Sequence, residues 1–270
     1  MYQFNYHKPA TLEDAAKLFA EADDGFYLSG GQTLIPTLKQ RLASPSDVID
    51  LSGIEALQGI EVSGGVVSVG AFTRHAEVAG SAAVAEALPV LAHLAGLIGD
   101  AQVRAMGTMG GSVANSDPAA DYPAAVIGLG ATLHTKTQTQ NRSIAADDYF
   151  QDLFETALEE GEILTRIDFP IPDRAAYRKF PNPASRYAVA GVLVVDFAGS
   201  IRVGVTGAGP CAFRATDMEA ALSADLRPEV ARSTAVSADN LNSDLHASAE
   251  YRANLVQVMA ERAVADLLAG

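Results

Sequence analysis

Two paired-glycine segments constrain the fold of this chain more than any other sequence feature. The first glycine segment follows a short apolar stretch and reads Ser29, Gly30, Gly31, Gln32 and Thr33. The second glycine segment contains Thr108, Gly110, Gly111 and Ser112. Glycine permits positive φ and close approach of a ligand, and free amides at the start of a helix attract anions. The segments predict two turns that together hold a large anionic ligand, although such glycines also serve as plain structural turns.

The residues around the first glycine segment predict a small α/β unit. Residues 11–22 have the spacing of an amphipathic helix, and residues 26–28 read as a short strand that runs into the glycines. Helical spacing resumes at residue 33 and a further strand follows at residues 48–51. Residues 60–70 alternate in the manner of a β-hairpin around Gly64 and Gly65. The order of elements therefore predicts an α/β unit over residues 1–54 and a second unit from residue 55.

The rest of the chain predicts two further groups of elements. We expect a helix over residues 84–98 that ends at Gly99, and a glycine-rich segment over 107–121 that leads into a helix over 122–129. The proline-rich stretch over 170–183 reads as a boundary or exposed loop. Strands are expected at 131–135, 142–144, 162–169, 187–197 and 201–206, and helices at 214–222, 228–238 and 248–268.

Composition excludes several classes of function. The formal charge of −14 and the scattered lysines and arginines argue against nucleic-acid binding. No apolar run approaches the roughly 20 residues of a membrane helix, and the N-terminal residues carry no export signal. These features predict a cytoplasmic protein without a membrane span. The single cysteine, Cys211, cannot form an internal disulfide or ligate an iron–sulfur cluster by itself.

Common cofactor and catalytic motifs are absent from the chain. It has no G-x-G-x-x-G, no phosphate-binding G-x-x-x-x-G-K-[ST] and no G-x-S-x-G elbow. The five histidines have no metal-ligand spacing. Asp117 and Asp121 precede a predicted helix, where an aspartate serves either as a cap or as an acceptor for ribose or ribityl hydroxyls. The residues themselves favour a dinucleotide ligand and leave both roles of the aspartates open.

Taken together, these motifs resemble those of the medium, flavoprotein subunit of the aerobic carbon monoxide dehydrogenase and xanthine dehydrogenase family. The two glycine segments carry the resemblance, together with Ile35-Pro36, residues 39–43, residues 100–108 and Arg214-Ala215. It covers nearly the whole chain. It implies an α+β protein with a FAD-binding fold of the vanillyl-alcohol-oxidase (PCMH) type in two subdomains, residues 1–54 and 55–172. Residues 173–270 would form a C-terminal α/β domain with a small antiparallel sheet and helices.

The resemblance also implies a non-covalently held FAD and a set of residues around it. The two glycine segments would hold the diphosphate, and Asp121 matches an acidic residue that contacts cofactor hydroxyls. Leu164 matches a position that lines the flavin region. Lys179 and Tyr187 fall where the family has a lysine and an aromatic residue near the isoalloxazine, although Pro181 and Pro183 make the intervening loop different. From the residues alone, Lys179 also reads as a solvated loop charge and Tyr187 as a half-buried strand residue.

A family member of this kind relays electrons and needs partners. The resemblance implies a small subunit with two [2Fe-2S] clusters, a large subunit with the molybdenum cofactor, and a dimer of heterotrimers. It implies no catalytic acid or base in this chain, and the substrate of the complex and its external electron acceptor are not readable from these residues. Two alternatives stay open at this point: a stand-alone FAD oxidase, and a flavin-free assembly protein of the same fold.

Overall fold

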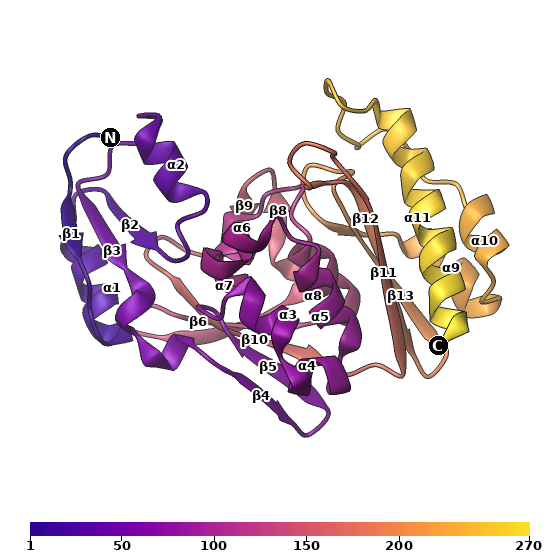
Figure 1. Ribbon diagram of the computed structural model, residues 1–270, viewed down its shortest axis with the longest axis horizontal. Coiled ribbons are helices and arrows are strands. Elements are labelled where there is room, and N and C mark those ends of the chain that lie inside the picture. Colours follow the sequence, from indigo (N-terminus) through magenta and orange to yellow (C-terminus); the bar gives the residue numbers. More distant parts are fainter.

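The computed structural model describes residues 1–270 as three sheets arranged along the long axis of the molecule, with the N-terminal sheet at one end and the C-terminal sheet toward the other (Figure 1). The first sheet is parallel, in the order β1-β3-β2. Its strands and helices are β1 Asn5–His7, α1 Leu12–Glu21, β2 Gly25–Leu28, α2 Leu34–Lys39 and β3 Asp47–Asp50. Thr11 caps α1 by accepting a hydrogen bond from the Asp14 amide at 3.1 Å.

The second sheet is antiparallel, with the order β4-β5-β10-β6-β7, and helices α3 to α8 accompany it. Its strands are β4 Ile60–Ser63, β5 Val66–Gly70, β6 Thr132–Lys136, β7 Asn141–Ala145 and β10 Ile163–Pro170. The helices are α3 His75–Gly80, α4 Ala82–Ala87, α5 Pro89–Gly96, α6 Ala101–Met106, α7 Met109–Asn115 and α8 Tyr122–Leu129. A short hairpin of β8 Phe150–Asp152 and β9 Glu155–Thr156 stands apart from this sheet.

The third sheet is antiparallel, with the order β11-β12-β13-β14. It comprises β11 Arg174–Pro181, β12 Ala188–Phe197, β13 Ser200–Thr206 and β14 Phe213–Arg214, with the helices α9 Thr216–Ala224, α10 Pro228–Ser233 and α11 Ala249–Ala269. Helices α9 and α11 cover the outer face of the sheet, α10 packs against these two helices, and α8 lies against the inner face (Figure 1). None of the helices is both long and apolar enough to span a membrane.

Helix α8 is the layer that joins the second and third sheets. All of its residues, from Tyr122 to Leu129, are buried, and it contacts β10 on one side and β12 and β13 on the other. A helix that is apolar on every side is stable in water only when other elements pack against all of its sides. The contact with β13 is a close backbone approach, since a Cβ built on Gly204 would lie 2.4 Å from the Ala124 carbonyl oxygen and 2.8 Å from the Gly128 nitrogen.

The hydrophobic cores do not follow the predicted domain boundaries strictly. The N-terminal core around Ala15 and Ile49 also contains Phe72 and Ile163, which come from the second unit. The central core likewise contains Tyr177, Leu193 and Val195 from the third sheet. The division at residues 54 and 172 separates the three sheets but cuts through two shared cores, so independent domains with these limits remain a prediction.

Several predicted elements differ from the structure for local physical reasons. The helix expected over 84–98 is two helices, because Leu88 precedes Pro89 and adopts φ −146° and ψ 66°, outside the helical region. The segment expected to be an exposed loop over 170–183 contains β11, an edge strand that ends at Pro181, where a proline removes no ladder hydrogen bond from an inner strand. The glycine-rich segment contains α7, and the helix expected over 228–238 already ends at Ser233.

We expect Gly204→Ala to lower the free energy of unfolding by about 1–3 kcal/mol, because the added methyl group would push β13 away from α8. Chemical denaturation followed by circular dichroism measures this change. Gly80→Ala is the matched control, since its Cβ would meet no atom within 4 Å and Gly80 ends a helix. Equal stability of the two variants would contradict a tight contact between α8 and β13.

Candidate functional site

A cavity of about 680 Å³ lies where the N-terminal sheet meets the helices of the second unit. A volume of this size is typical of small-molecule and cofactor sites. Thirteen of the fourteen predicted site residues line it: Ser29, Gly30, Gly31, Gln32, Thr33, Thr108, Gly110, Gly111, Ser112, Asp117, Asp121, Leu164 and Tyr187. Lys179 does not line it.

The first glycine segment offers unused backbone donors to this cavity. Gly31 has φ +71°, a conformation that glycine adopts without strain, and it turns the chain from β2 into α2. The backbone amides of Gly30, Gly31, Gln32 and Thr33 have no acceptor within the protein. Consecutive unpaired amides at the start of a helix form a local positive site on a protein of any net charge. An anionic group is therefore the expected partner of this segment.

The second glycine segment, in contrast, has its amides occupied by the protein. The Met109 amide donates to the Thr73 carbonyl at 3.0 Å, and the Gly110 amide donates to the Ala71 carbonyl at 2.8 Å. The Gly111 amide donates to the Thr108 hydroxyl at 3.2 Å, which makes Thr108 the N-cap of α7. A Cβ on Gly110 would lie 2.7 Å from the Ala71 carbonyl oxygen. Gly110 is thus required by packing, and this segment presents hydroxyls and a bare backbone rather than free amides.

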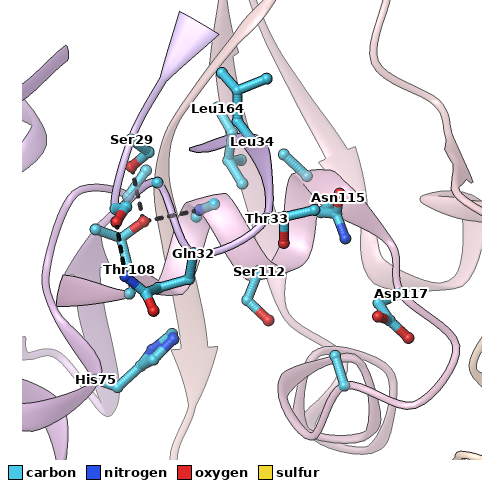
Figure 2. Close-up of a pocket in the computed structure, with 18 of the residues that line it drawn as sticks. Ser29, Gln32, Thr33, Leu34, His75, Thr108, Ser112, Asn115, Asp117 and Leu164 are labelled. Carbon is cyan, nitrogen blue, oxygen red and sulfur yellow. Dashed lines mark hydrogen bonds between the residues drawn. The ribbon is translucent and has the colours of Figure 1, made fainter. Parts of the chain in front are cut away.

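The two glycine segments touch each other directly. Ser29 Oγ and Thr108 Oγ1 are 2.7 Å apart and share a hydrogen bond (Figure 2). A Cβ on Gly30 would lie 2.3 Å from the Met106 carbonyl oxygen and 2.7 Å from the Gly107 Cα. No side chain fits between the two backbones, so the segments form one continuous wall of the cavity.

The two aspartates of the site have different partners. Asp117 lines the cavity, and one of its oxygens accepts a hydrogen bond from the Ala119 amide at 2.9 Å; burial raises the pKa of its carboxyl group. Its second oxygen has no partner in the protein. Asp121 is only 4% exposed and accepts hydrogen bonds from the Tyr177 hydroxyl at 2.6 Å and from Lys179 Nζ at 3.0 Å. Asp121 makes no capping hydrogen bond to α8, which excludes that alternative.

Lys179 is a buried structural link rather than a solvated loop charge. Its side chain is 4% exposed, and its ammonium group donates to Asp121, to the Leu97 carbonyl at 3.0 Å and to the Arg186 carbonyl at 2.9 Å. Burial raises the pKa of Asp121, and the Lys179 charge and the Tyr177 hydroxyl oppose that rise. Lys179 joins β11, the end of α5 and the turn before β12 behind the cavity wall.

Tyr187 lies at the opening of the cavity. Tyr187 immediately precedes β12 and is 46% exposed. It lines the cavity together with Ser185 and Arg186. Partial burial and the negative charges of Asp117 and Asp121 raise the pKa of its phenol. The structure therefore places Tyr187 beside the cavity and not half within the core.

Sequence reasoning missed the strand end that supports the second glycine segment. Residues 71–75 run alongside residues 107–110, joined by the hydrogen bonds of Ala71 and Thr73 and by the His75 amide, which donates to the Gly107 carbonyl at 2.9 Å. His75 lines the cavity on the same side as Thr108, while Ser112, Asn115 and Asp117 continue the wall from α7 (Figure 2). No local pattern signals this contact, because more than thirty residues separate the two stretches. Other lining residues that were missed are Leu34, Thr37, Leu57, Phe72, Ile98, Val103, Leu158 and Ile163.

Comparison of this chain with known proteins identifies the family to which it belongs. The model of the FAD binding domain in molybdopterin dehydrogenase matches residues 2–172. The glyceraldehyde dehydrogenase medium chain of Sulfolobus acidocaldarius is 34% identical over 273 residues, which is 97% of each chain. The carbon monoxide dehydrogenase medium chain of Afipia carboxidovorans is 36% identical over 276 residues, or 97% of this chain and 95% of the relative.

Solved structures agree with the sequence matches. The reconstituted carbon monoxide dehydrogenase from Oligotropha carboxidovorans contains a chain that superposes with a TM-score of 0.91 at 35% identity, covering 99% of this chain and 98% of the other. The fold and the site define the protein as a FAD-binding oxidoreductase subunit with a PCMH-type fold. It belongs to the family of medium subunits of molybdenum-containing dehydrogenases, which includes the aerobic carbon monoxide dehydrogenases and xanthine dehydrogenases.

We expect Lys179→Met to lower the free energy of unfolding by about 3–5 kcal/mol, because it leaves the Asp121 carboxylate buried without its cationic partner. Thermal and chemical denaturation measure the loss. Lys17→Met is the control, since Lys17 pairs with Glu21 on an exposed helix face and should change stability little. If Lys179→Met kept its stability but lost cofactor affinity, Lys179 would be a ligand of the cofactor and not a structural link.

Proposed function

We propose that this chain binds one FAD non-covalently in the cavity and relays electrons from iron–sulfur clusters of a partner subunit to an external acceptor. The observation that carries the proposal is the row of unpaired amides at residues 30–33, which lines a cavity of cofactor size beside a second segment of glycines and hydroxyl residues. A diphosphate is an anion that such a row accommodates. When bound, the flavin supplies the redox chemistry.

The lining residues divide into roles that suit a dinucleotide. The amides of the first glycine segment would hold the diphosphate, and the hydroxyls of Thr33 and Ser112 lie along the same cavity (Figure 2). Asp117, with one carboxylate oxygen unpaired, suits the hydroxyls of a ribose or ribityl chain better than Asp121, whose oxygens are occupied. Leu34 and Leu164 provide an apolar surface for a ring. Tyr187 stands at the opening, where it would meet whichever ring system extends outward.

The partner subunits follow from the family. We infer an iron–sulfur small subunit and a molybdenum large subunit, assembled with this chain as a dimer of heterotrimers. In support, the relatives are named as medium chains of enzymes, and two with similar identity to this chain are named for different substrates, glyceraldehyde and carbon monoxide. Such variation fits substrate selection outside the medium chain. A permanent interface of this kind is expected to bury on the order of 2,000 Å² or more.

Purification at native expression levels tests the proposal. We expect the chain to copurify with two partner chains, with molybdenum and iron, and with FAD that mild denaturation releases intact. Substrate should bleach the flavin absorbance in the complex and leave it unchanged in the isolated chain, which lacks the metal centres. Substrate oxidation by the isolated chain would favour a stand-alone oxidase. A chain without flavin would favour an assembly protein, and flavin attached to peptide would contradict non-covalent binding.

We expect Gly31→Ala to weaken FAD binding by at least tenfold, roughly 1.4 kcal/mol, because a side chain both disfavours φ +71° and meets Ile35 Cδ1 at 2.6 Å. The turn that presents the free amides would then change shape. Titration of the apoprotein with FAD, followed by flavin fluorescence, measures the dissociation constant.

Gly65→Ala is the matched control for the backbone effect. Gly65 has φ +78°, its Cβ would meet no atom within 4 Å, and it lies in the turn between β4 and β5, away from the cavity. Both variants should lose stability through their strained backbone, with a larger loss for Gly31→Ala because of the contact with Ile35, but only Gly31→Ala should lose cofactor. Full flavin occupancy of Gly31→Ala would show that the first glycine segment is only a turn.

A further inference from the structure

His75 is the one histidine that lines the cavity, and the proposed function gives its imidazole ring no role. It is the first residue of α3 and is only 4% exposed. Its backbone amide donates a hydrogen bond to the Gly107 carbonyl. The ring packs against Tyr122 of α8, with a centroid separation of 5.3 Å and an interplanar angle of 51°. Figure 2 shows the ring below Thr108 and Gln32, directed toward the interior of the cavity.

The two ring nitrogens of His75 have different surroundings. Nδ1 is fully buried and has no hydrogen-bond partner, and the neighbouring Tyr122 hydroxyl is also buried without one. A buried polar atom without a partner costs stability and is rare in native proteins. An orphaned N–H is rarer than an orphaned lone pair, so the ring proton belongs on Nε2. The edge of the ring that carries Nε2 is therefore the hydrogen-bond donor.

Nε2 lies beside the contact between the two glycine segments. A Cβ built on Gly107 would lie 2.6 Å from Nε2, and a Cβ built on Gly30 would lie 2.7 Å from the Gly107 Cα. Gly107 thus stands between the His75 ring and the unpaired amides that begin at Gly30, and it adds no side chain there. His75 and the residues of the amide row therefore lie on either side of Gly107, and all of them line the cavity.

The groups around the ring keep it uncharged. Arg104 of α6 is the charged group that acts on it, and Tyr122 of α8 is its other titratable neighbour; Asp121 is bound to Tyr177 and Lys179. Burial, and secondly the Arg104 charge, lower the pKa of His75 to about 4. No carboxylate of the protein stabilises the imidazolium. An anionic ligand would supply the missing negative charge.

We propose that the Nε2–H of His75 donates a hydrogen bond to the diphosphate of the bound dinucleotide, and that cofactor binding is therefore coupled to proton uptake at this ring. The inference rests on the proposed FAD site and deepens it. A nearby dianion favours the charged imidazolium, so the pKa of His75 is higher in the complex than in the free protein. Protonation and binding then support each other, and the affinity for FAD increases as pH falls through the pKa of the complex.

The test titrates the full-length apoprotein with FAD between about pH 8 and about pH 5 and measures proton uptake by calorimetry in two buffers with different ionisation heats. We expect the wild-type dissociation constant to decrease at the lower pH, with net uptake of protons. His75→Gln keeps a donor without titrating, so it should bind like the wild type at the higher pH and lose the pH dependence. His75→Phe should bind about tenfold more weakly and without pH dependence.

His93→Gln is the control, because His93 is an exposed residue in the last turn of α5 and should leave the affinity and proton uptake unchanged. If both His75 variants kept wild-type affinity and proton uptake, the proposal would be overturned while the FAD site itself stood. Absence of FAD binding by the wild-type protein would instead overturn the proposed function. Circular dichroism of each variant confirms the fold, and a histidine NMR signal that titrates identically with and without FAD would also contradict the proposal.

Discussion

The contact between the backbones at Gly30 and at Met106–Gly107 determines how the remaining parts of the site are arranged. A side chain at Gly30 would collide with the Met106–Gly107 backbone, and the Ser29–Thr108 hydrogen bond lies beside this contact. Because the first backbone belongs to the parallel N-terminal sheet and the second to the helices over the antiparallel sheet, the contact fixes one unit on the other. Residues 30–33 line the cavity with amides that have no acceptor in the protein, whereas the amides of the second glycine segment hold α7 in place.

A second connection reaches the cavity from behind. Asp121 begins α8, and it binds Tyr177 and Lys179 of β11, so a buried carboxylate links the cofactor cavity to the third sheet. Lys179 also holds the carbonyl of Arg186, next to Tyr187 at the opening. The position of Tyr187 therefore depends on an ion pair that a cofactor need not touch. Residues of this kind influence a site through rigidity, which is the usual requirement for a preorganised binding pocket.

Local patterns predicted much of the fold, and their failures have identifiable causes. The spacing of apolar residues located α1, and the alternation around Gly64 and Gly65 located the β4–β5 hairpin, because both signals lie within a few residues. Helix α7 was missed because Gly110 and Gly111 are poor helix formers, and tertiary contacts with Ala71 override that preference. The glycine segments were also visible in the sequence. The role of His75 was not, since it depends on a neighbour at residue 107, and nothing local revealed that only the first segment keeps its amides free.

The burial of α8 limits how this chain can be divided. The family model ends at residue 172, and that limit suggests a self-contained cofactor domain. Yet α8 is apolar on every side, and β12 and β13, which begin at residue 188, cover its outer face. A fragment truncated at residue 172 would expose that face to water and would be prone to aggregate. We therefore expect the matched segment to need the third sheet, or an equivalent cover for α8, in order to fold.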